Sequence, residues 1–293
     1  MSASSASVEA QGKLNLFLRV LARESGGYHQ LETLFVRLEL ADTVRVSTAT
    51  KARELRSTGA ASGPPERNVA FLAAERFASA AGWPDGFLIE IEKRLPVGGG
   101  LGGGSADAGA ALRALNALAP KPLTARALAG VAFSVGADVP FLTDDVALAL
   151  AWGRGERLLA LRPLPAREVL LVAPPFGVST KDAFGWLALA RGSAISEALP
   201  PLAVDQLERW EQIARLAGND LEGVVIERHP ELGVALTVLE TAGAKIARMT
   251  GSGSTLFGVF DRRPPPELGG IPDGFRVVHT RTATSVAPVR LLD

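Results

Sequence analysis

The sequence predicts a mixed α+β fold, on two observations about its hydrophobic pattern. Some segments alternate apolar and polar residues with the two-residue period of a β-strand, and residues 13–21 are the clearest case. Others, such as residues 106–118, carry a strong helix former at most positions. The two kinds of segment are mixed without regular strand–helix–strand alternation, and no internal repeat is visible. We therefore expect an α+β protein.

The composition bounds the class of protein. The chain has 293 residues, of which 47% are hydrophobic, enough for one large or two modest domains with a sizeable core. Lys+Arg and Asp+Glu both number 31, so the near-zero net charge favours neither nucleic acid nor a membrane surface as partner. Cysteine is absent, which excludes disulfides, thiolate catalysis and cysteine metal sites. The three histidines are far apart, which argues against a histidine metal cluster.

The cellular location follows from what the sequence lacks. No apolar run reaches membrane-spanning length, because charge or proline interrupts each candidate. The first residues lack the charged and apolar regions of a secretory signal. We expect a cytoplasmic protein that begins with a short disordered tail over residues 1–11.

The first half of the chain continues with further predicted elements. Residues 34–46 alternate and predict one or two strands, whereas residues 51–67 are rich in Ser, Gly, Pro and charge and predict a loop. Asn68 is of the N-cap type and precedes the helical segment 69–81. Residues 87–92 predict another strand.

In the rest of the chain, Thr124 is expected to cap a helix. The residue pattern changes near residues 160–166, where we place an approximate domain boundary. The pattern predicts strands over 146–152, 168–173, 245–249, 256–260 and 275–280, and helices over 181–190 (with Thr180 as cap), 204–216 and 230–241.

The most informative stretch is a glycine loop between the strand 87–92 and the helix 106–118. Six of the seven residues 98–104 are glycine, so the backbone can adopt positive φ and approach a ligand closely. The following helix N-terminus adds free N–H groups and the positive end of the helix dipole, which suit an anion such as phosphate. A flexible turn is the alternative, but an idle turn rarely needs six glycines before a helix. The loop lacks the Gly-Lys-Ser/Thr ending of a Walker A loop, and its match to a dinucleotide-binding fingerprint is weak.

This loop resembles the central Pro-x-x-x-Gly-Leu-Gly-Ser/Gly-Ser motif of the GHMP kinase superfamily, through Pro96, Gly100, Leu101, Gly102, Gly104 and Ser105. Five motifs in all are similar, in the same order, to those of its diphosphocytidyl-methylerythritol kinase family. They lie at residues 13–18, 27–34, 96–105, 136–141 and 249–253. Three departures are Gly26, where the family has Asp, Thr250, where it has Ser, and Asp144-Asp145, in a region where relatives often have Gly.

The resemblance implies the GHMP kinase fold. An N-terminal ATP-binding lobe over 12–162 and a C-terminal lobe over 163–293 would enclose the active site in a cleft between them. It further implies transfer of the ATP γ-phosphoryl group to the 2-hydroxyl of 4-diphosphocytidyl-2-C-methyl-D-erythritol. Another GHMP kinase, acting on homoserine or a sugar, and a nucleotide-binding regulator without catalysis are the alternatives. The partner is expected to be a small-molecule substrate, with no nucleic acid or membrane, and the chain to be a monomer or homodimer.

The resemblance also assigns catalytic roles. Asp138 would take the proton of the substrate hydroxyl and Lys13 would neutralise developing charge. From the residues alone, Lys13 is equally a solvated strand-edge lysine. Asp138 lies in an apolar run, where a partly buried carboxylate needs a partner or a function, although a turn-forming Asp is the alternative.

ATP and Mg²⁺ are the cofactors that the resemblance implies. Ser105 would lie near the β- and γ-phosphates and Mg²⁺. The expected ATP-binding residues are Pro96, Gly98, Gly99, Gly100, Leu101, Gly102, Gly103, Gly104 and Ser105. Asn68 and Lys93 are left open, because helix capping and a solvated strand end explain them equally well.

In the resembling family, aromatic side chains flank the cytosine ring. Here these would be Tyr28 and Phe184, with His29 reading the base edge. Core packing explains either aromatic residue almost as well, and a hairpin turn alone could explain the second small-residue loop at 250–255. The expected substrate-binding residues are Asn15, Tyr28, His29, Phe184, Gly251, Ser252 and Gly253.

Overall fold

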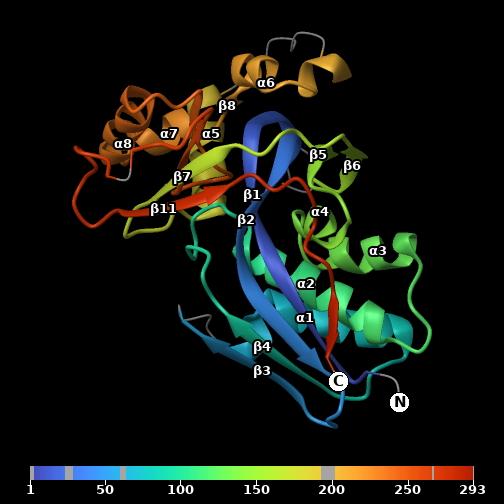
Figure 1. Ribbon diagram of the computed structural model, residues 1–293. Helices are drawn as coiled ribbons and strands as arrows, with labels where there is room; N and C mark the ends of the chain where they lie inside the picture. Colours follow the sequence, from blue (N-terminus) through green and yellow to red (C-terminus); the bar gives the residue numbers. More distant parts are fainter. Residues whose placement is uncertain (1–2, 24–28, 60–63, 193–201, 266, 293) are drawn as a thin grey trace.

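The computed structural model describes residues 3–23, 29–59, 64–192, 202–265 and 267–292. The protein is built on two sheets (Figure 1). An eight-stranded sheet has the central order β12-β1-β2-β4-β3, with β5, β6 and β8 attached beside that path. A four-stranded sheet has the order β11-β7-β10-β9. The predicted α+β class is confirmed.

A long antiparallel pair forms the spine of the large sheet: β1 (Ser5–Arg23) and β2 (His29–Ser47). The prediction of a disordered tail over 1–11 is wrong for residues 5–11, because β1 already begins at Ser5. The small residues Ala6, Val8 and Ala10 alternate into the core, a pattern that polar neighbours and short side chains make inconspicuous in the sequence.

The predicted loop over 51–67 is also wrong in part. It contains β3 (Arg53–Thr58), a mostly exposed edge strand that runs parallel to β4 (Phe87–Glu92), and the short η1 helix (Pro65–Arg67). A strand at an exposed edge keeps polar side chains, so its sequence resembles that of a loop.

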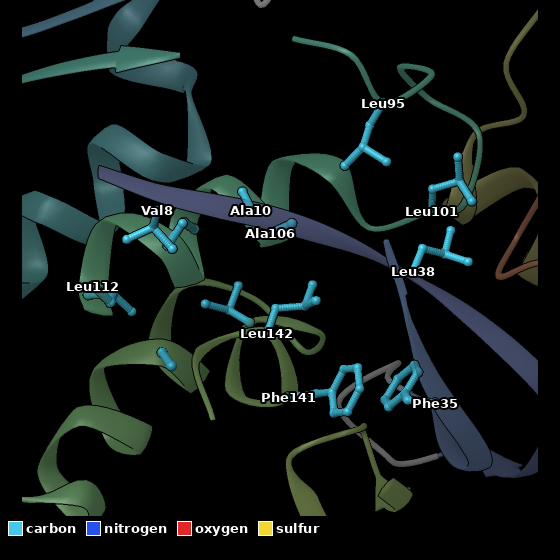
Figure 2. Packing of buried hydrophobic residues seen from close by; sticks show 14 of the residues in the cluster. Val8, Ala10, Phe35, Leu38, Leu95, Leu101, Ala106, Leu112, Phe141 and Leu142 are labelled. Carbon is cyan, nitrogen blue, oxygen red and sulfur yellow. The ribbon is translucent and has the colours of Figure 1, made fainter. Parts of the chain in front are cut away.

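Four helices share the core of the large sheet: α1 (Val69–Ala81), α2 (Gly103–Leu118), α3 (Ala125–Val135) and α4 (Val139–Thr143). α1 and α2 contact its strands directly, whereas α3 packs on the other three helices (Figure 1). Two predicted N-caps are confirmed, since Asn68 accepts a hydrogen bond from Ala70 N and Thr124 from Ala127 N. Figure 2 shows part of this core, including the facing rings of Phe35 on β2 and Phe141 on α4. The sheet is extended by β5 (Leu148–Gly153) and β6 (Arg157–Ala160).

The four-stranded sheet consists of β7 (Glu168–Ala173), β9 (Ile246–Met249), β10 (Leu256–Phe260) and β11 (Arg276–Arg281). Both of its faces are covered, because Val169 and Leu171 join the core of the large sheet whereas Leu170 and Val172 pack in a second core. The second core holds side chains of α5 (Thr180–Arg191), α7 (Glu222–Ile226) and α8 (Pro230–Thr241).

Two predictions for this half need correction, and two short strands were not predicted. The helix expected over 204–216 is interrupted and consists of η2 (Val204–Leu207) and α6 (Trp210–Leu216). Ser179, not Thr180, caps α5, with its hydroxyl accepting from Asp182 N. The short strands β8 (Gly218–Asn219) and β12 (Arg290–Leu292) both pair with β1, so the C-terminal part of the chain returns to the large sheet. A boundary between two lobes at residues 162/163 stays a prediction. Residues 290–292 lie in the predicted C-terminal lobe by sequence but pair with β1 of the large sheet.

Candidate active site

A cleft of about 1210 Å³ lies where the two glycine loops, β1, β2 and α5 meet. Tyr28 lies outside the described residues, and every other predicted site residue lines this cleft. The lining residues among them are Lys13, Asn15, His29, Pro96, Gly98 to Ser105, Asp138, Phe184, Gly251, Ser252 and Gly253. The fold therefore brings the separate motifs to one place.

The first glycine loop leads directly into α2. Gly98, Gly100 and Gly102 have φ of 75°, 77° and 71°, a region that other residues rarely adopt. The helix begins at Gly103, three residues earlier than predicted, and its N-cap Gly102 supplies no side-chain cap. The N–H groups of the first turn, which includes Ser105, are thus free of a side-chain cap and can bind an anion at the cleft.

The second glycine loop, residues 250–255, packs directly on the first. Thr255 N donates to Gly99 O at 3.2 Å. A Cβ on Gly100 would lie 2.1 Å from Thr250 O, so only glycine permits this approach. The two loops form one continuous wall, which explains why the sequence needs small residues at both.

Lys13 and Asp138 form an ion pair at the cleft, with Nζ and Oδ2 3.3 Å apart. Lys13 is buried, whereas the Asp138 side chain is 32% exposed and faces the cleft from the N-terminus of α4. The Lys13 side chain also lies against the first loop, since a Cβ on Gly102 would be 3.2 Å from Lys13 Cε. The ammonium group therefore lies between the loop and the carboxylate.

Asn15 holds this lysine in place. Lys13 Nζ donates to Asn15 Oδ1, and Asn15 Nδ2 donates to Thr33 Oγ1 at 2.8 Å. The Asn15 backbone N–H donates to Thr250 Oγ1 at 3.2 Å, which connects β1 to the second glycine loop. Both the oxygen and the nitrogen of the Asn15 side-chain amide thus have structural partners, and its role as a substrate-binding residue stays a prediction.

The sequence analysis missed a buried triad beneath the first loop. Lys93 Nζ donates to Asp107 Oδ2 at 2.7 Å and also to Asp42, so Lys93 is not a solvated strand end. Asp42 Oδ1 accepts from Arg94 N and Leu95 N, at the start of the loop. Burial raises the pKa of Asp107 to about 7, although Lys93 opposes the shift. A lysine before the loop was the only local signal, because the two aspartates come from other elements.

Two aromatic rings mark the opposite part of the cleft. His29, the first residue of β2, stacks on Phe184 of α5 with centroids 4.7 Å apart and an interplanar angle of 23°. Thr180 Oγ1 and Ser252 Oγ are hydrogen-bonded at 2.9 Å nearby, joining α5 to the second glycine loop. A planar ring with hydrogen-bonding edges would find both an aromatic face and an imidazole here.

The charge of the cleft differs from that of the whole chain, which is neutral. Among the described lining residues, five are basic and two are acidic, so the cleft is positive and attracts anionic ligands. The basic residues are Lys13, Arg67, Lys93, Arg154 and Lys181, and the acidic ones are Asp107 and Asp138.

The described residues contain no group of three His, Cys, Asp or Glu side chains that could hold a metal ion. Mg²⁺ does not need such a group, because it commonly binds through one or two protein oxygens together with phosphate oxygens and water. The Ser105 hydroxyl at the cleft is an oxygen donor of this kind. The donor set fits Mg²⁺ that is carried by a bound phosphate chain.

Over the same described residues, no helix has the length and apolarity to cross a membrane.

Comparison with known proteins supports a kinase site. The family model of the GHMP kinase N-terminal domain matches residues 68–151, and that of the GHMP kinase C-terminal domain matches residues 202–268. The chain is 40% identical over 253 residues to the 4-diphosphocytidyl-2-C-methyl-D-erythritol kinase of Moorella thermoacetica, covering 85% of this chain and 88% of the relative. The kinase of the same name from an Anaeromyxobacter species is 41% identical, covering 87% of this chain and 80% of the relative.

Solved structures agree. A crystal structure of 4-(cytidine 5'-diphospho)-2C-methyl-D-erythritol kinase superposes with a TM-score of 0.72 and 33% sequence identity, covering 94% of this chain and 98% of that one. Homoserine kinase from Cytophaga hutchinsonii has a TM-score of 0.69 at 18% identity, covering 99% and 98%, a likeness of fold alone.

Proposed function

The chain belongs to the 4-diphosphocytidyl-2-C-methyl-D-erythritol kinases, which are GHMP kinases of the non-mevalonate route to isoprenoid precursors, and we propose the residues with which it works. Lys13 and Asp138 carry out the chemistry, the first glycine loop binds ATP, and the region around His29 and Phe184 binds the cytidine end of the substrate. The observation that carries this proposal is the Lys13–Asp138 ion pair, which faces the cleft beside the loop.

Phosphoryl transfer depends mainly on positioning and charge stabilisation. In the proposed mechanism, the substrate hydroxyl lies against the Asp138 carboxylate, which accepts its proton as the oxygen attacks the γ-phosphorus. The bond from the γ-phosphorus to the bridging oxygen of ATP breaks, and ADP leaves with its electron pair. The Lys13 ammonium, already 3.3 Å from that carboxylate, stabilises the negative charge that moves onto the transferring group. Because Lys13 is buried and held by Asn15, its ammonium group is already in position before the substrate binds.

Nucleotide binding is assigned to the N-terminus of α2. The free N–H groups of residues 103–105 and the positive helix end face the phosphates. Ser105 would hold Mg²⁺ jointly with the phosphates, and the ion would supply further neutralisation of their charge when bound.

The cytidine end is assigned to the other part of the cleft. The stacked pair of His29 and Phe184 presents aromatic surface to the base, and Lys181 and Thr180 at the N-terminus of α5 line the same cavity. Gly251, Ser252 and Gly253 line the wall between this region and the ATP loop, which suits the diphosphate that lies between base and sugar alcohol.

A substrate panel tests the proposal. Purified protein with ATP and Mg²⁺ is given the diphosphocytidyl substrate, homoserine, mevalonate or galactose, and ADP release is measured. We expect rapid ADP release with the cytidine substrate alone, and loss of it in Asp138→Asn. Equal turnover of homoserine would contradict the assignment of the cytidine region, whereas ATP binding without ADP release would indicate a regulator. A cytoplasmic location and a monomeric or homodimeric state are proposed together with this function.

A further inference from the structure

Arg37 is a buried arginine that the proposed mechanism does not use. It lies in the middle of β2 and is only 2% exposed, and within the described residues no carboxylate forms an ion pair with it. Burial is the main cause that lowers the pKa of this guanidinium to about 9. A buried charge is costly, and replacing one by an apolar side chain often stabilises a protein. The charge at this position therefore calls for a reason other than stability.

The guanidinium group binds one short stretch of chain. Nη2 donates to Phe141 O and to Asp144 O, both at 2.8 Å, and Nε donates to Val146 O at 2.9 Å. The Arg37 backbone N–H donates to Ala147 O at 2.9 Å as well. One residue thus satisfies four carbonyl groups between positions 141 and 147, which form the end of α4 and its connection to β5.

That stretch positions Asp138. α4 is only five residues long, Val139–Thr143, and Asp138 is its N-cap residue. A helix this short gains little stability of its own, so its place depends on tertiary contacts. Gly109 of α2 allows the backbone at Leu142 to lie close, since a Cβ there would be 2.5 Å from Leu142 O. Arg37 holds the other side of the same turn.

The same contacts connect Asp138 to Lys13 through a column of stacked groups. The Arg37 guanidinium carbon lies 5.1 Å from the centroid of the Phe141 ring, and Phe141 stacks on Phe35 at 4.9 Å (Figure 2). Lys13 Nζ in turn lies over the Phe35 ring, 5.3 Å from its centroid. Lys13 is also the residue opposite Arg37 in the β1–β2 ladder. Lys13 contacts Phe35, and the helix that carries Asp138 contacts Phe35 and Arg37 through Phe141. Both members of the ion pair are therefore connected to the same strand, β2.

We infer that Arg37 is a positioning residue for phosphoryl transfer: it fixes α4 so that the Asp138 carboxylate meets Lys13 and the acceptor hydroxyl. This inference rests on the proposed role of Asp138. Arg37 lines no part of the cleft among the described residues, so it acts only through other groups. Lysine cannot replace it, because a single ammonium lacks the planar fork that reaches three carbonyls at once.

The test is a double-mutant cycle on the full chain, with Arg37→Lys measured alone and in the Asp138→Asn background. All rates are divided by the concentration of ATP-binding sites from calorimetry, so unfolded molecules are not counted. We expect Arg37→Lys to lower kcat by about 10- to 100-fold, as a misplacement of about 1 Å can. The KM for ATP should change little. In the Asp138→Asn background the same change should alter kcat less than about twofold, because the group it positions is gone.

Arg113→Lys is the matched control. Arg113 is a partly buried arginine that also donates to a carbonyl, Ala287 O at 2.6 Å in the C-terminal segment, and burial lowers its pKa too. Its charge helps to lower the pKa of Arg37, and Arg113→Lys keeps that charge. We expect Arg113→Lys to leave kcat unchanged. Arg37→Gln, which keeps an N–H₂ donor without the charge, replaces Arg37→Lys if the latter does not fold.

Each outcome is informative. A normal kcat in the Arg37 variants, with the kcat of Asp138→Asn lowered as predicted, would overturn the inference and leave the proposed function intact. An equal loss of kcat in both backgrounds would show that Arg37 acts independently of Asp138, and would overturn it too. Full activity of Asp138→Asn alone would instead refute the proposed function, and the inference with it.

Discussion

Lys13 and Asp138 illustrate how much of this site depends on two side chains. A carboxylate is a weak base at neutral pH, but a loose phosphoryl-transfer transition state needs little base strength if the proton leaves late. The lysine contributes to the same step, because its charge stabilises the negative charge on the transferring group. Because their charged groups are only 3.3 Å apart, we expect the two side chains to act together, so that neither alone supplies the full catalytic effect.

The first prediction concerns this unit. Asp138→Asn keeps the size of the side chain and removes the proton acceptor, so kcat should fall by about 100-fold or more, the range of general acid–base catalysis. Lys13→Met should also lower kcat, and the double variant should be far from additive. Steady-state kinetics measure the effect, and calorimetry should find ATP and the cytidine substrate still bound by Asp138→Asn. Independent, multiplicative losses would contradict a joint role.

Asp107 makes a different kind of contribution, because it is buried in the triad with Lys93 and Asp42 rather than exposed to substrate. Its Oδ1 is buried and has no hydrogen-bond partner among the described residues. Two carboxylates share one ammonium there, and burial raises the pKa of Asp107 from 3.8 to about 7. Between pH 3.8 and about 7, the folded protein therefore retains a proton on Asp107 that the unfolded chain releases.

A pH dependence of stability follows. Since the folded-state pKa is raised, the stabilisation from the protonated Asp107 is complete below pH 3.8 and is lost as pH rises through about 7. The free energy of unfolding of the wild type, relative to that of Asp107→Asn, should decline across this window and level off above it. Urea titrations of both proteins without Mg²⁺, from pH 4.5 to 8.5, measure the difference. A constant difference over that range would mean that Asp107 is ionised throughout.

The first glycine loop is one element whose glycines have unequal roles. Gly100 combines positive φ with a close approach to Thr250 O, whereas at Gly103 the nearest atom to a new Cβ is Lys93 Nζ at 3.5 Å, an ordinary contact. Gly103 is also helical, and alanine favours a helix more than glycine does.

This contrast is the third prediction. Gly100→Ala should lower the affinity for ATP and destabilise the fold, by about 1–2 kcal/mol for the backbone conformation alone and more for the clash. Gly103→Ala should keep the melting temperature, while Gly103→Val should bind ATP more weakly because its bulk enters the phosphate region. Calorimetry and thermal melts distinguish these effects. Equal stability of Gly100→Ala and Gly103→Ala would contradict the tight packing of the loops.

Elements with strong local signals were predictable. The predicted bounds of α1 and α8 agree with the structure, because clear helical segments are bounded by Asn68, Pro230 and Gly243. Strands β4, β7 and β10 also agree, because their apolar runs are short and well bounded. β3 was missed because this exposed edge strand carries mostly polar residues, and β12 because it has only three residues and depends on a partner that is distant in the chain.

The site divides in the same way. Motif residues such as Ser105 and Asp138 could be placed from a resemblance, since each sits in a recognisable local pattern. Asp42, Asp107 and Arg37 could not, because their significance comes from neighbours on other elements and appears only when the chain is folded. Tyr28, predicted to flank the base, lies outside the described residues.

In the whole molecule, the cleft is a junction between the two sheets. β1 of the large sheet contributes Lys13 and Asn15, and the turn between β9 and β10 of the small sheet contributes the second glycine loop. The sheets do not meet as separate bodies, since one face of the small sheet packs in the core of the large one. Substrate and nucleotide sites therefore share a wall whose geometry depends on contacts across this junction.

Thr250 is the most compact of these contacts, and the last prediction concerns it. Its hydroxyl, fully buried, accepts from Asn15 N at 3.2 Å and lies 3.4 Å from Gly100 O, so one oxygen connects β1 and both glycine loops. Thr250→Val keeps the shape and leaves the Asn15 N–H without a partner, which should lower the free energy of unfolding by about 1–3 kcal/mol. Activity should fall too, because Asn15 orients Lys13. Thr250→Ser keeps the oxygen and is the control, expected to retain most of the stability and turnover. Urea unfolding and steady-state kinetics on the three proteins decide the matter: if Thr250→Val is as stable and active as Thr250→Ser, the hydroxyl is dispensable and apolar packing alone joins the two sheets at the cleft.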